Sequence, residues 1–575
     1  MNAGPRWPGP AADGGGLGER LAVIVLGGVL IAGLGAWLVT QLAAILFAGG
    51  ATSLSPGDAI GGLARMPGHL GDPRAAWPAR VRSQLPGPAG FYAAALLVIA
   101  GLAVAAVGVA RLVRWAREHA PLAGHPAGRD RHAARWARPA DLRALAVKAP
   151  ARGRVTLGRA GGRLLAAEER QSAIIIAPTQ SLKTTGLAIP AILEWDGPVL
   201  ATSVKTDLLR DTIEHRRSVG DVLVFDPAES TGLHADGWTP LSGCQSWQGA
   251  QRTAAVLCAA ARPGGSTLAD ADFWYSAAAK LLAPVLFAAA MVDEGSMADV
   301  VRWVDTQEVD EVRDALQQVD IEEALQAAQA TWGRDERQRS SIYTTAETVL
   351  QAYADPGVLA AAYQPDLTPD RLLDGFRTTA YLCAPAHEQQ RLRPLFATLI
   401  EQVIAAVYDR AARTGTPLDP PLLLVLDEAA NVAALPSLDT LAATAAGQGI
   451  QLVSVFQDLA QIRERWGTRA LTIVNNHRAK LIGSGIADPD TLDYAARVLG
   501  DEEIAQLSST AGQEGRASTT QSTTYRSLAP AHTLRQAEPG SAVLIYGSLP
   551  PARIRLRPWF ADRHLRELAK AREHT

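Results

Sequence analysis

Residues 177–185 combine a lysine and several hydroxyls in a short loop between an apolar run and an apolar helical pattern. In a strand–loop–helix of this kind, backbone N–H groups surround phosphates, the lysine ammonium contacts the β- and γ-phosphate oxygens, and the next hydroxyl binds Mg²⁺. We therefore predict a nucleoside triphosphate site here, with Thr184 as a metal ligand. The predicted binding residues are Ala177, Pro178, Thr179, Gln180, Ser181, Leu182, Lys183, Thr184 and Thr185.

The loop departs from the usual GxxxxGK[ST] pattern at both glycine positions, which are Ala177 and Leu182 here. Glycine suits such loops because they need left-handed backbone angles and a close approach of the ligand. Taken alone, the match is weak, and a strand–turn–helix with a solvent-exposed lysine is the alternative. Because Leu182 replaces the glycine before the lysine, the loop could bind a triphosphate and hydrolyse it, or bind it without hydrolysis.

Two further apolar runs end in polar side chains that suit the same chemistry. Leu422–Leu426 is followed by Asp427 and Glu428, and Gln451–Phe456 is followed by Gln457. An aspartate at a strand end can hold Mg²⁺, and an adjacent glutamate can orient the attacking water. A glutamine on a neighbouring strand can sense the γ-phosphate. We predict Asp427 as a metal ligand and Glu428 and Gln457 as catalytic residues, because ligands bind at the carboxyl edge of open α/β sheets.

The elements that must position these residues form an α/β pattern. Short apolar runs, typical of buried parallel strands with helices on both faces, recur from Ser172 to the C-terminal region. The stretch 245–370 has helical periodicity, for example over Phe273–Val292, and predicts an all-α insertion. Residues 509–527 are rich in Ser, Thr and Gly and predict a flexible loop. The strand-like runs are SAIIIA, PVLATSVK, DVLVFDP, TAYLCAP, PLLLVLDE, QLVSVFQD, AKLIGSG and SAVLIYGS.

Two long uncharged runs near the N-terminus predict a membrane anchor. Leu21–Phe47 and Phe91–Ala110 contain 27 and 20 residues, and helices of that length cross a hydrocarbon core of roughly 30 Å. A buried globular helix, or a signal peptide for the first run, is the alternative. By the positive-inside rule, the arginines that follow the second run place the large C-terminal part in the cytoplasm, with 48–90 as the outward loop. These arginines are Arg111, Arg114, Arg117, Arg129, Arg131, Arg135, Arg138 and Arg143.

Composition adds constraints on the class of protein. With 575 residues, 48% of them hydrophobic, the chain can bury sizeable cores. A formal net charge of −3 gives no global indication of a nucleic-acid partner. The three cysteines lack CxxC spacing, which fits a reducing compartment. The predicted organisation is a tail (1–20), a two-span anchor (21–117), a linker with a short helix (118–150), a nucleotide-binding part (151–244), the all-α insertion (245–370), a second nucleotide-binding part (371–562) and a tail (563–575).

Several stretches together resemble the type IV secretion coupling proteins of the TraG/TraD class. They include IIIAPTQSLKTTGLAIPAIL, TSVKTDLLRDTIEHR, LLLVLDEAANVAALPSLDTLAATAAGQGIQLVSVFQDLAQI and SAVLIYGSLPPARIRLRPWF. The resemblance implies a RecA-like P-loop ATPase sheet with an all-α insertion, preceded by two transmembrane helices. It also implies ATP and Mg²⁺ as cofactors, with Lys183 and Thr184 on phosphate and metal. A homo-hexamer that transfers single-stranded DNA with relaxase, or protein effectors, through other secretion-channel components is implied as well.

Some details of the resemblance leave alternatives. Some members of the family carry an arginine about eleven residues before the sensor glutamine, where this chain has Ala446, so Arg463 and Arg465 are the candidates for an arginine finger. Arginines that could grip DNA phosphates could equally be solvated and balanced by neighbouring acids. An ATPase-impaired membrane scaffold and an FtsK-like DNA translocase are the alternative functions. The candidate DNA-contacting arginines are Arg334, Arg337 and Arg339 in the insertion and Arg463, Arg465 and Arg469 after Gln457.

Overall fold

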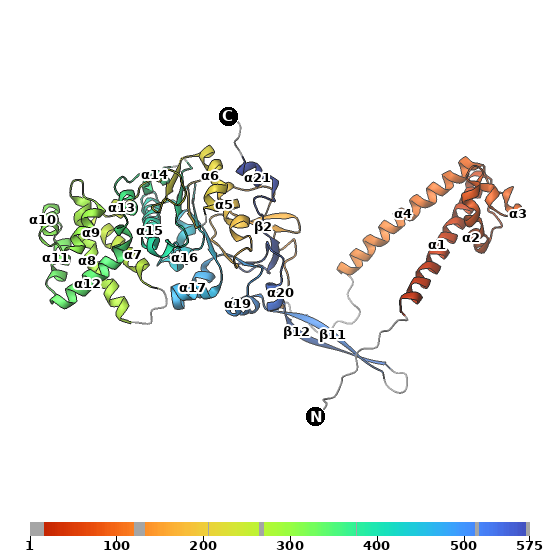
Figure 1. Ribbon diagram of the computed structural model, residues 1–575. Coiled ribbons are helices and arrows are strands. Elements are labelled where there is room, and N and C mark those ends of the chain that lie inside the picture. The colour runs from red at the N-terminus through yellow and green to blue at the C-terminus, as the bar shows by residue number, and fades with distance from the viewer. Residues whose placement is uncertain are drawn as a thin grey trace, which may run out of the picture. The chain divides into compact units, whose positions relative to one another are not determined.

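The computed structural model describes residues 16–119, 133–204, 206–263, 269–374, 377–511 and 517–570 (Figure 1). The chain divides into two compact units, Met1–Gly128 and Arg129–Thr575. Arg129 and Arg131, which contributed to the predicted orientation in the membrane, lie outside the described residues.

The first unit contains the two long helices expected from the sequence, α1 (Gly16–Phe47) and α4 (Pro88–His119). Within α4, the stretch Pro88–Ala105 is long and apolar enough to cross a membrane, and little of it is buried. In α1, the described side chains include a shorter apolar stretch, Ala32–Phe47. The other helix that passes the same test, Ala271–Met291, is mostly buried in the second unit. That helix is therefore a core helix, whereas α1 and α4 stay candidates for spans.

The segment between α1 and α4 is folded rather than extended. It contains α2 (Pro56–Arg65), α3 (Ala79–Arg82) and two short 3₁₀ turns. Trp77 is fully buried, and a Cβ at Gly62 would lie 2.3 Å from its ring, so only glycine lets the two approach this closely. In the second half of α1, the indole N–H of Trp37 donates to the carbonyl of Leu54. The predicted outward loop 48–90 is therefore a small helical cap with a core of its own.

The second unit is built on a 12-stranded mixed sheet, in the order β1-β3-β2-β14-β13-β10-β4-β9-β8-β5-β7-β6. The strands from β10 to β6 are parallel, and the others pair antiparallel. All eight runs read as strands in the sequence are strands here. Their bounds are β4 (Ala173–Ile176), β5 (Val199–Ser203), β6 (Val222–Phe225), β7 (Thr379–Cys383), β8 (Leu422–Leu426), β9 (Ile450–Phe456), β10 (Ala479–Gly483) and β13 (Ser541–Tyr546).

Both faces of the parallel part are covered by helices, as its apolar strands require. Along β4, Ile174 and Ile176 contribute to one core, while Ala173 and Ile175 contribute to the other, because side chains alternate along a strand. The second core lies under α5 (Ile189–Leu193), α6 (Asp207–Val219) and α21 (Arg563–Ala569). The first core lies under α15 (Gln389–Thr414), α16 (Leu438–Gln448), α17 (Leu459–Trp466), α18 (Ala470–Asn476), α19 (Pro489–Leu499) and α20 (Ala531–Arg535).

The insertion between β6 and β7 is helical, as its periodicity predicts, and forms one end of this unit in Figure 1. Its longest helix, α8 (Ala269–Met291), packs against α7 (Trp247–Ala261) and α12 (Glu336–Leu350). The remaining helices are α9 (Met297–Asp305), α10 (Asp310–Val319), α11 (Glu322–Trp332), α13 (Pro356–Ala361) and α14 (Pro369–Leu373). Cys244, Cys258 and Cys383 are free and buried.

Three sequence predictions are wrong. The predicted C-terminal tail 563–575 contains α21, and Leu565 of this helix is buried in the second core. Of the predicted linker with a short helix (118–150), residues 120–132 lie outside the described residues. Residues 133–150 contain no helix and are not a linker, because Leu142 and Leu145 are buried in the sheet core and β1 (Ala146–Val147) joins the sheet edge. The predicted flexible loop 509–527 lies mostly in the hairpin of β11 (Asp501–Ala511) and β12 (Ala517–Ser527). Regular cross-strand pairing gives this Ser/Thr-rich segment a structure that its polarity did not suggest. The sequence also gave no indication of β2 (Thr156–Ala160), β3 (Arg163–Ala166) and β14 (Ala552–Arg555).

Candidate nucleotide-binding site

The loop 177–183 joins the central strand β4 to a helical turn, Thr184–Ala188, that continues into α5. This turn is π-helical, a local widening that is frequent at functional sites. Gln180 and Leu182 have left-handed backbone angles, with φ of 63° and 66°. Leu182 therefore adopts the backbone conformation for which glycine is usually required, at a cost of roughly 1–2 kcal/mol.

Lys183 and Thr184 follow this strained loop and face the end of β8. Lys183 is buried, and its Nζ lies 3.3 Å from the carbonyl oxygen of Pro178. The Thr184 hydroxyl lies 3.1 and 3.3 Å from the two carboxylate oxygens of Asp427. The strand-end aspartate and the hydroxyl that follows the lysine thus meet at one edge of the sheet.

Asp427 is a buried carboxyl group whose charge requires a partner. Burial raises its pKa to about 7, although Lys183 and the Thr184 hydrogen bond lower it and Glu428 raises it further. The Thr202 hydroxyl donates to the backbone carbonyl of Asp427 and fixes this turn on the neighbouring strand β5. A buried carboxylate beside a hydroxyl is an oxygen ligand set of the kind that Mg²⁺ prefers, so these residues fit a bound divalent cation.

Glu428 is held between two side-chain amides. The Gln457 amide lies 3.5 Å from Glu428 Oε1, and the Asn431 amide donates to Oε2 at 3.1 Å. Glu428 itself has a left-handed backbone, with φ of 50°. Its carboxylate is therefore oriented rather than free to rotate. The sequence analysis missed Asn431, and its position three residues after Glu428 in the loop after β8 was the available indication.

A hollow of about 220 Å³ lies between the loop and the two acids. Ala177, Pro178, Ser181 and Gln457 are not part of its lining. The Thr185 hydroxyl is buried and has no hydrogen-bond partner among the described residues, so a polar ligand at this turn would satisfy it. The lining consists of Thr179, Gln180, Leu182, Lys183, Thr184, Thr185, Val204, Asp207, Asp427 and Glu428.

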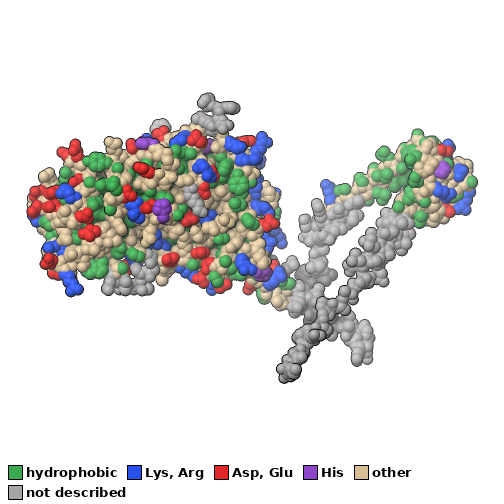
Figure 2. All heavy atoms as spheres, in the orientation of Figure 1, with side chains coloured by type: hydrophobic (Ala, Val, Ile, Leu, Met, Phe, Trp, Pro, Cys, Tyr) green, Lys and Arg blue, Asp and Glu red, His purple; other side chains and the backbone are tan. Residues whose placement is uncertain are grey.

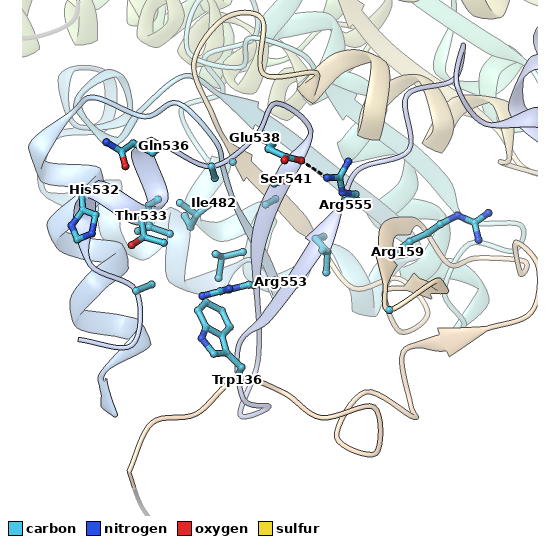
Figure 3. A pocket seen from close by; sticks show the side chains of 18 of the residues that line it. Trp136, Arg159, Ile482, His532, Thr533, Gln536, Glu538, Ser541, Arg553 and Arg555 are labelled. Carbon is cyan, nitrogen blue, oxygen red and sulfur yellow. Dashed lines mark hydrogen bonds and ion pairs between the residues drawn. The ribbon is translucent and has the colours of Figure 1, made fainter. Parts of the chain in front are cut away.

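A larger hollow of about 920 Å³ lies elsewhere, between α20, β13, β14 and the β2–β3 turn (Figure 3). Its arginines already have partners. Arg553 lies 4.3 Å over the ring of Trp136, Arg555 pairs with Glu538, and Arg159 pairs with Asp562. Since none of the loop residues 177–185 line it, this hollow does not compete as the phosphate site.

Several arginines predicted to contact DNA or act as a finger are engaged within the chain. Arg465 donates to the backbone carbonyls of Ala260 and Arg262, and its pKa falls to about 10 through burial and the neighbouring Arg393 and Arg262. Its guanidinium is therefore committed within the chain, which argues against a finger role. Arg463 and Arg469 pair with Asp490 and Asp439, and Arg463 stays a prediction.

The insertion does not present a basic surface for DNA at α9–α11. Residues 293–323 contain eleven acidic residues and two arginines, and acidic side chains predominate in Figure 2 where Figure 1 places α10 and α11. Arg339 donates to the carbonyl of Trp332, while Arg337 is exposed on α12. A surface of this charge repels phosphates. Arg334, Arg337 and Arg339 lie outside this acidic stretch, and their contact with DNA stays a prediction.

Comparison with known proteins identifies the fold and the family of this chain. TrwB, a bacterial conjugative coupling protein, superposes with a TM-score of 0.59 and 18% identity over 76% of this chain and 95% of the TrwB chain. A TrwB structure with ADP and Mg²⁺ has a TM-score of 0.57.

Curated relatives point to the same group. The conjugal transfer protein TraG of Agrobacterium fabrum is 24% identical over 67% of this chain and 60% of its own length. TraG of Escherichia coli is 26% identical over 50% of this chain and 48% of its own length. The chain thus spans about half to three-fifths of these two relatives. Residues 140–574 match the profile of the family described as type IV secretory system conjugative DNA transfer, and the chain belongs to that family.

Proposed function

We propose that this chain is a membrane-anchored ATPase that couples a DNA–relaxase or protein substrate to a type IV secretion channel. The observation that carries the proposal is the convergence of Lys183, Thr184 and Asp427 on one hollow at the carboxyl edge of the sheet. Membership of the conjugative DNA transfer family supports DNA transfer as the process in which this chain acts. The nucleotide complexes of TrwB support ATP and Mg²⁺ as the cofactors.

In this proposal, a bound Mg–ATP complex supplies the phosphoanhydride and a cation that neutralises charge as its bond breaks. Lys183 holds the β- and γ-phosphate oxygens, and Thr184 and Asp427 hold the metal. Glu428 takes the proton of the attacking water. The amides of Asn431 and Gln457 keep the Glu428 carboxylate in one orientation, so that the proton is accepted at a fixed place.

The remaining features follow from the family and the N-terminal helices. Helices α1 and α4 cross the cytoplasmic membrane, and the arginines that follow the apolar run of α4 keep the second unit in the cytoplasm. Six copies surround a channel for single-stranded DNA. An arginine finger comes from a neighbouring copy, for which Arg463 is the candidate.

An ATPase-impaired scaffold is the second candidate because Leu182 stands where the loop usually has glycine. Leu182 nevertheless adopts the required left-handed backbone, and its side chain extends to within 3.2 Å of a Cβ built on Gly540. The side chain has thus been accommodated beside the turn at Gly540. This accommodation favours the working ATPase.

ATP turnover by the purified full chain in detergent, with and without single-stranded DNA, tests the proposal. Turnover should be stimulated by DNA and should vanish in Lys183→Ala. Lys148→Ala, at an exposed lysine near the sheet edge, is the matched control and should retain turnover. Nucleotide binding without turnover in the parent chain would favour the scaffold. Stimulation by double-stranded DNA alone would favour a translocase of the FtsK kind.

A further inference from the structure

The segment Leu556–Asp562, here named the strap, follows β14 and lies against the turn after the phosphate loop. The Trp559 backbone N–H donates to the carbonyl of Thr185 at 3.0 Å, and that of Arg557 donates to Gly186 at 3.3 Å. A Cβ at Gly186 would lie 2.9 Å from Leu556 Cβ, so glycine permits this close approach. The strap therefore contacts the turn that carries Thr185, a residue that lines the candidate site.

Buried charges hold the strap in place. The Arg557 guanidinium pairs with Glu194 at 2.8 Å and with Asp562 at 3.0 Å, and all three side chains are nearly inaccessible. Glu194 directly follows α5, the helix that continues the turn after the phosphate loop. The Trp559 indole donates to Asp211 on α6 at 3.0 Å. The strap thus joins α5 and α6 by partly buried ion pairs and hydrogen bonds.

Phe560 is a large apolar side chain of the strap that stays half-exposed. Its side chain is 49% exposed, and it stands edge-to-face to Trp559 with ring centroids 6.1 Å apart. Because Trp559 is bonded to Thr185, the next residue along the strap is held close to the rim of the hollow that Thr185 lines. The anchored strap therefore carries a half-exposed apolar ring one residue from its contact with Thr185.

The size of the hollow leaves part of a nucleotide outside it. Drug-sized ligands occupy pockets of roughly 300–1,000 Å³, whereas this hollow measures about 220 Å³. The phosphates and a cation fill such a volume, so the nucleoside extends past its rim. Thr185 is the last of the phosphate-loop residues, and the strap contacts its carbonyl, so the strap is a surface that a nucleoside extending past the rim can reach.

We propose that Phe560 is the platform on which the base of a purine nucleoside triphosphate stacks, with Arg557 as the positioning residue that holds the strap. This inference rests on the proposed nucleotide site. Stacking on an aromatic ring is worth about 1–3 kcal/mol per base, which corresponds to roughly 5–150-fold in affinity. It accepts adenine and guanine alike, because each presents a flat face.

The test compares a ligand that has a base with one that has none. Affinities of the full chain in detergent are measured by calorimetry for Mg–ATP and for Mg–tripolyphosphate. Phe560→Ala should weaken ATP binding by roughly ten-fold or more and leave tripolyphosphate binding unchanged. Phe560→Trp should restore ATP binding. Tyr363→Ala, at an aromatic ring 68% exposed on the insertion, is the control and should change neither.

The outcomes separate this inference from the proposed function. If Phe560→Ala weakens the binding of neither ligand, or weakens the binding of both equally, the stacking proposal is wrong, because only the base distinguishes the two ligands. Lys183→Ala should weaken the binding of both ligands, and this expectation does not depend on whether Phe560 stacks on the base. A parent chain that binds neither ligand would overturn the nucleotide site itself. The stacking proposal is supported if Phe560→Ala weakens the binding of ATP but not of tripolyphosphate, and if Phe560→Trp binds ATP as the parent chain does.

Discussion

The Thr184 hydroxyl lies 3.1 Å from a carboxylate oxygen of Asp427, although the two residues are 243 positions apart in the chain. The sheet order explains the contact, because β4 and β8 are separated only by β9 and run parallel. Their carboxyl ends therefore reach the same edge. A hydroxyl and a buried carboxyl group at this distance have the chemistry of a shared metal site.

Glu428→Gln should preserve nucleotide affinity and lower turnover by roughly 10²–10⁴-fold, since the amide cannot accept the proton of the attacking water. Asn431→Ala should lower turnover less, because the Glu428 carboxylate stays in place and loses only the hydrogen bond that orients it. Steady-state kinetics with parallel binding measurements check both variants. Unchanged turnover in Glu428→Gln would remove this residue from the chemistry.

Leu182 variants should separate backbone strain from side-chain packing. Leu182→Val should destabilise the chain by at least about 1 kcal/mol, because a β-branched residue tolerates a left-handed backbone poorly. Leu182→Gly should relieve the strain and keep or raise turnover, with the lost packing offsetting part of the gain in stability. Thermal unfolding and ATP turnover are the measurements. Higher turnover in the valine variant than in the glycine variant would contradict the strain argument.

Arg557→Met should lower the free energy of unfolding by about 3–5 kcal/mol, because it leaves the buried Glu194 carboxylate without its partner. Adding Glu194→Gln to this variant should recover a substantial part of the loss. Denaturant unfolding of the single and double variants forms the test. A double variant as unstable as the sum of both single variants would show that the two groups do not interact.

His477 should make the second unit sensitive to acid. Burial lowers its pKa from 6.5 to about 4, and its ring bonds the Ser454 hydroxyl and the Ile473 carbonyl in the neutral form. The unfolded chain binds the proton first, so stability is full above pH 6.5 and falls as the pH drops toward 4. The shift corresponds to about 3 kcal/mol.

Unfolding free energies of the parent and of His477→Gln between pH 7.5 and 4.5 check this prediction. The glutamine variant starts from lower stability and should lose less of it on acidification. Parallel pH profiles for the two chains would show that other groups cause the acid sensitivity.

The sequence by itself determined the parallel strands and the residues at their ends. Runs such as Ile174–Ile176 and Leu422–Leu426 are apolar throughout, because both faces of a central strand are buried, and this pattern is visible locally. The motif residues follow these runs directly. The helical insertion was equally readable, since its periodicity is local.

Only the tertiary structure decided the features that depend on partners distant in the chain. The antiparallel extension of the sheet uses short strands with polar residues, such as β2 and β14, which carry no distinct pattern. Arg557 belongs to no local motif, and its role depends on Glu194, 363 positions away in the chain. The left-handed Leu182 and the exposed Phe560 likewise take their meaning from the loop and strap around them. Long-range contacts, which no local spacing encodes, fix all of these.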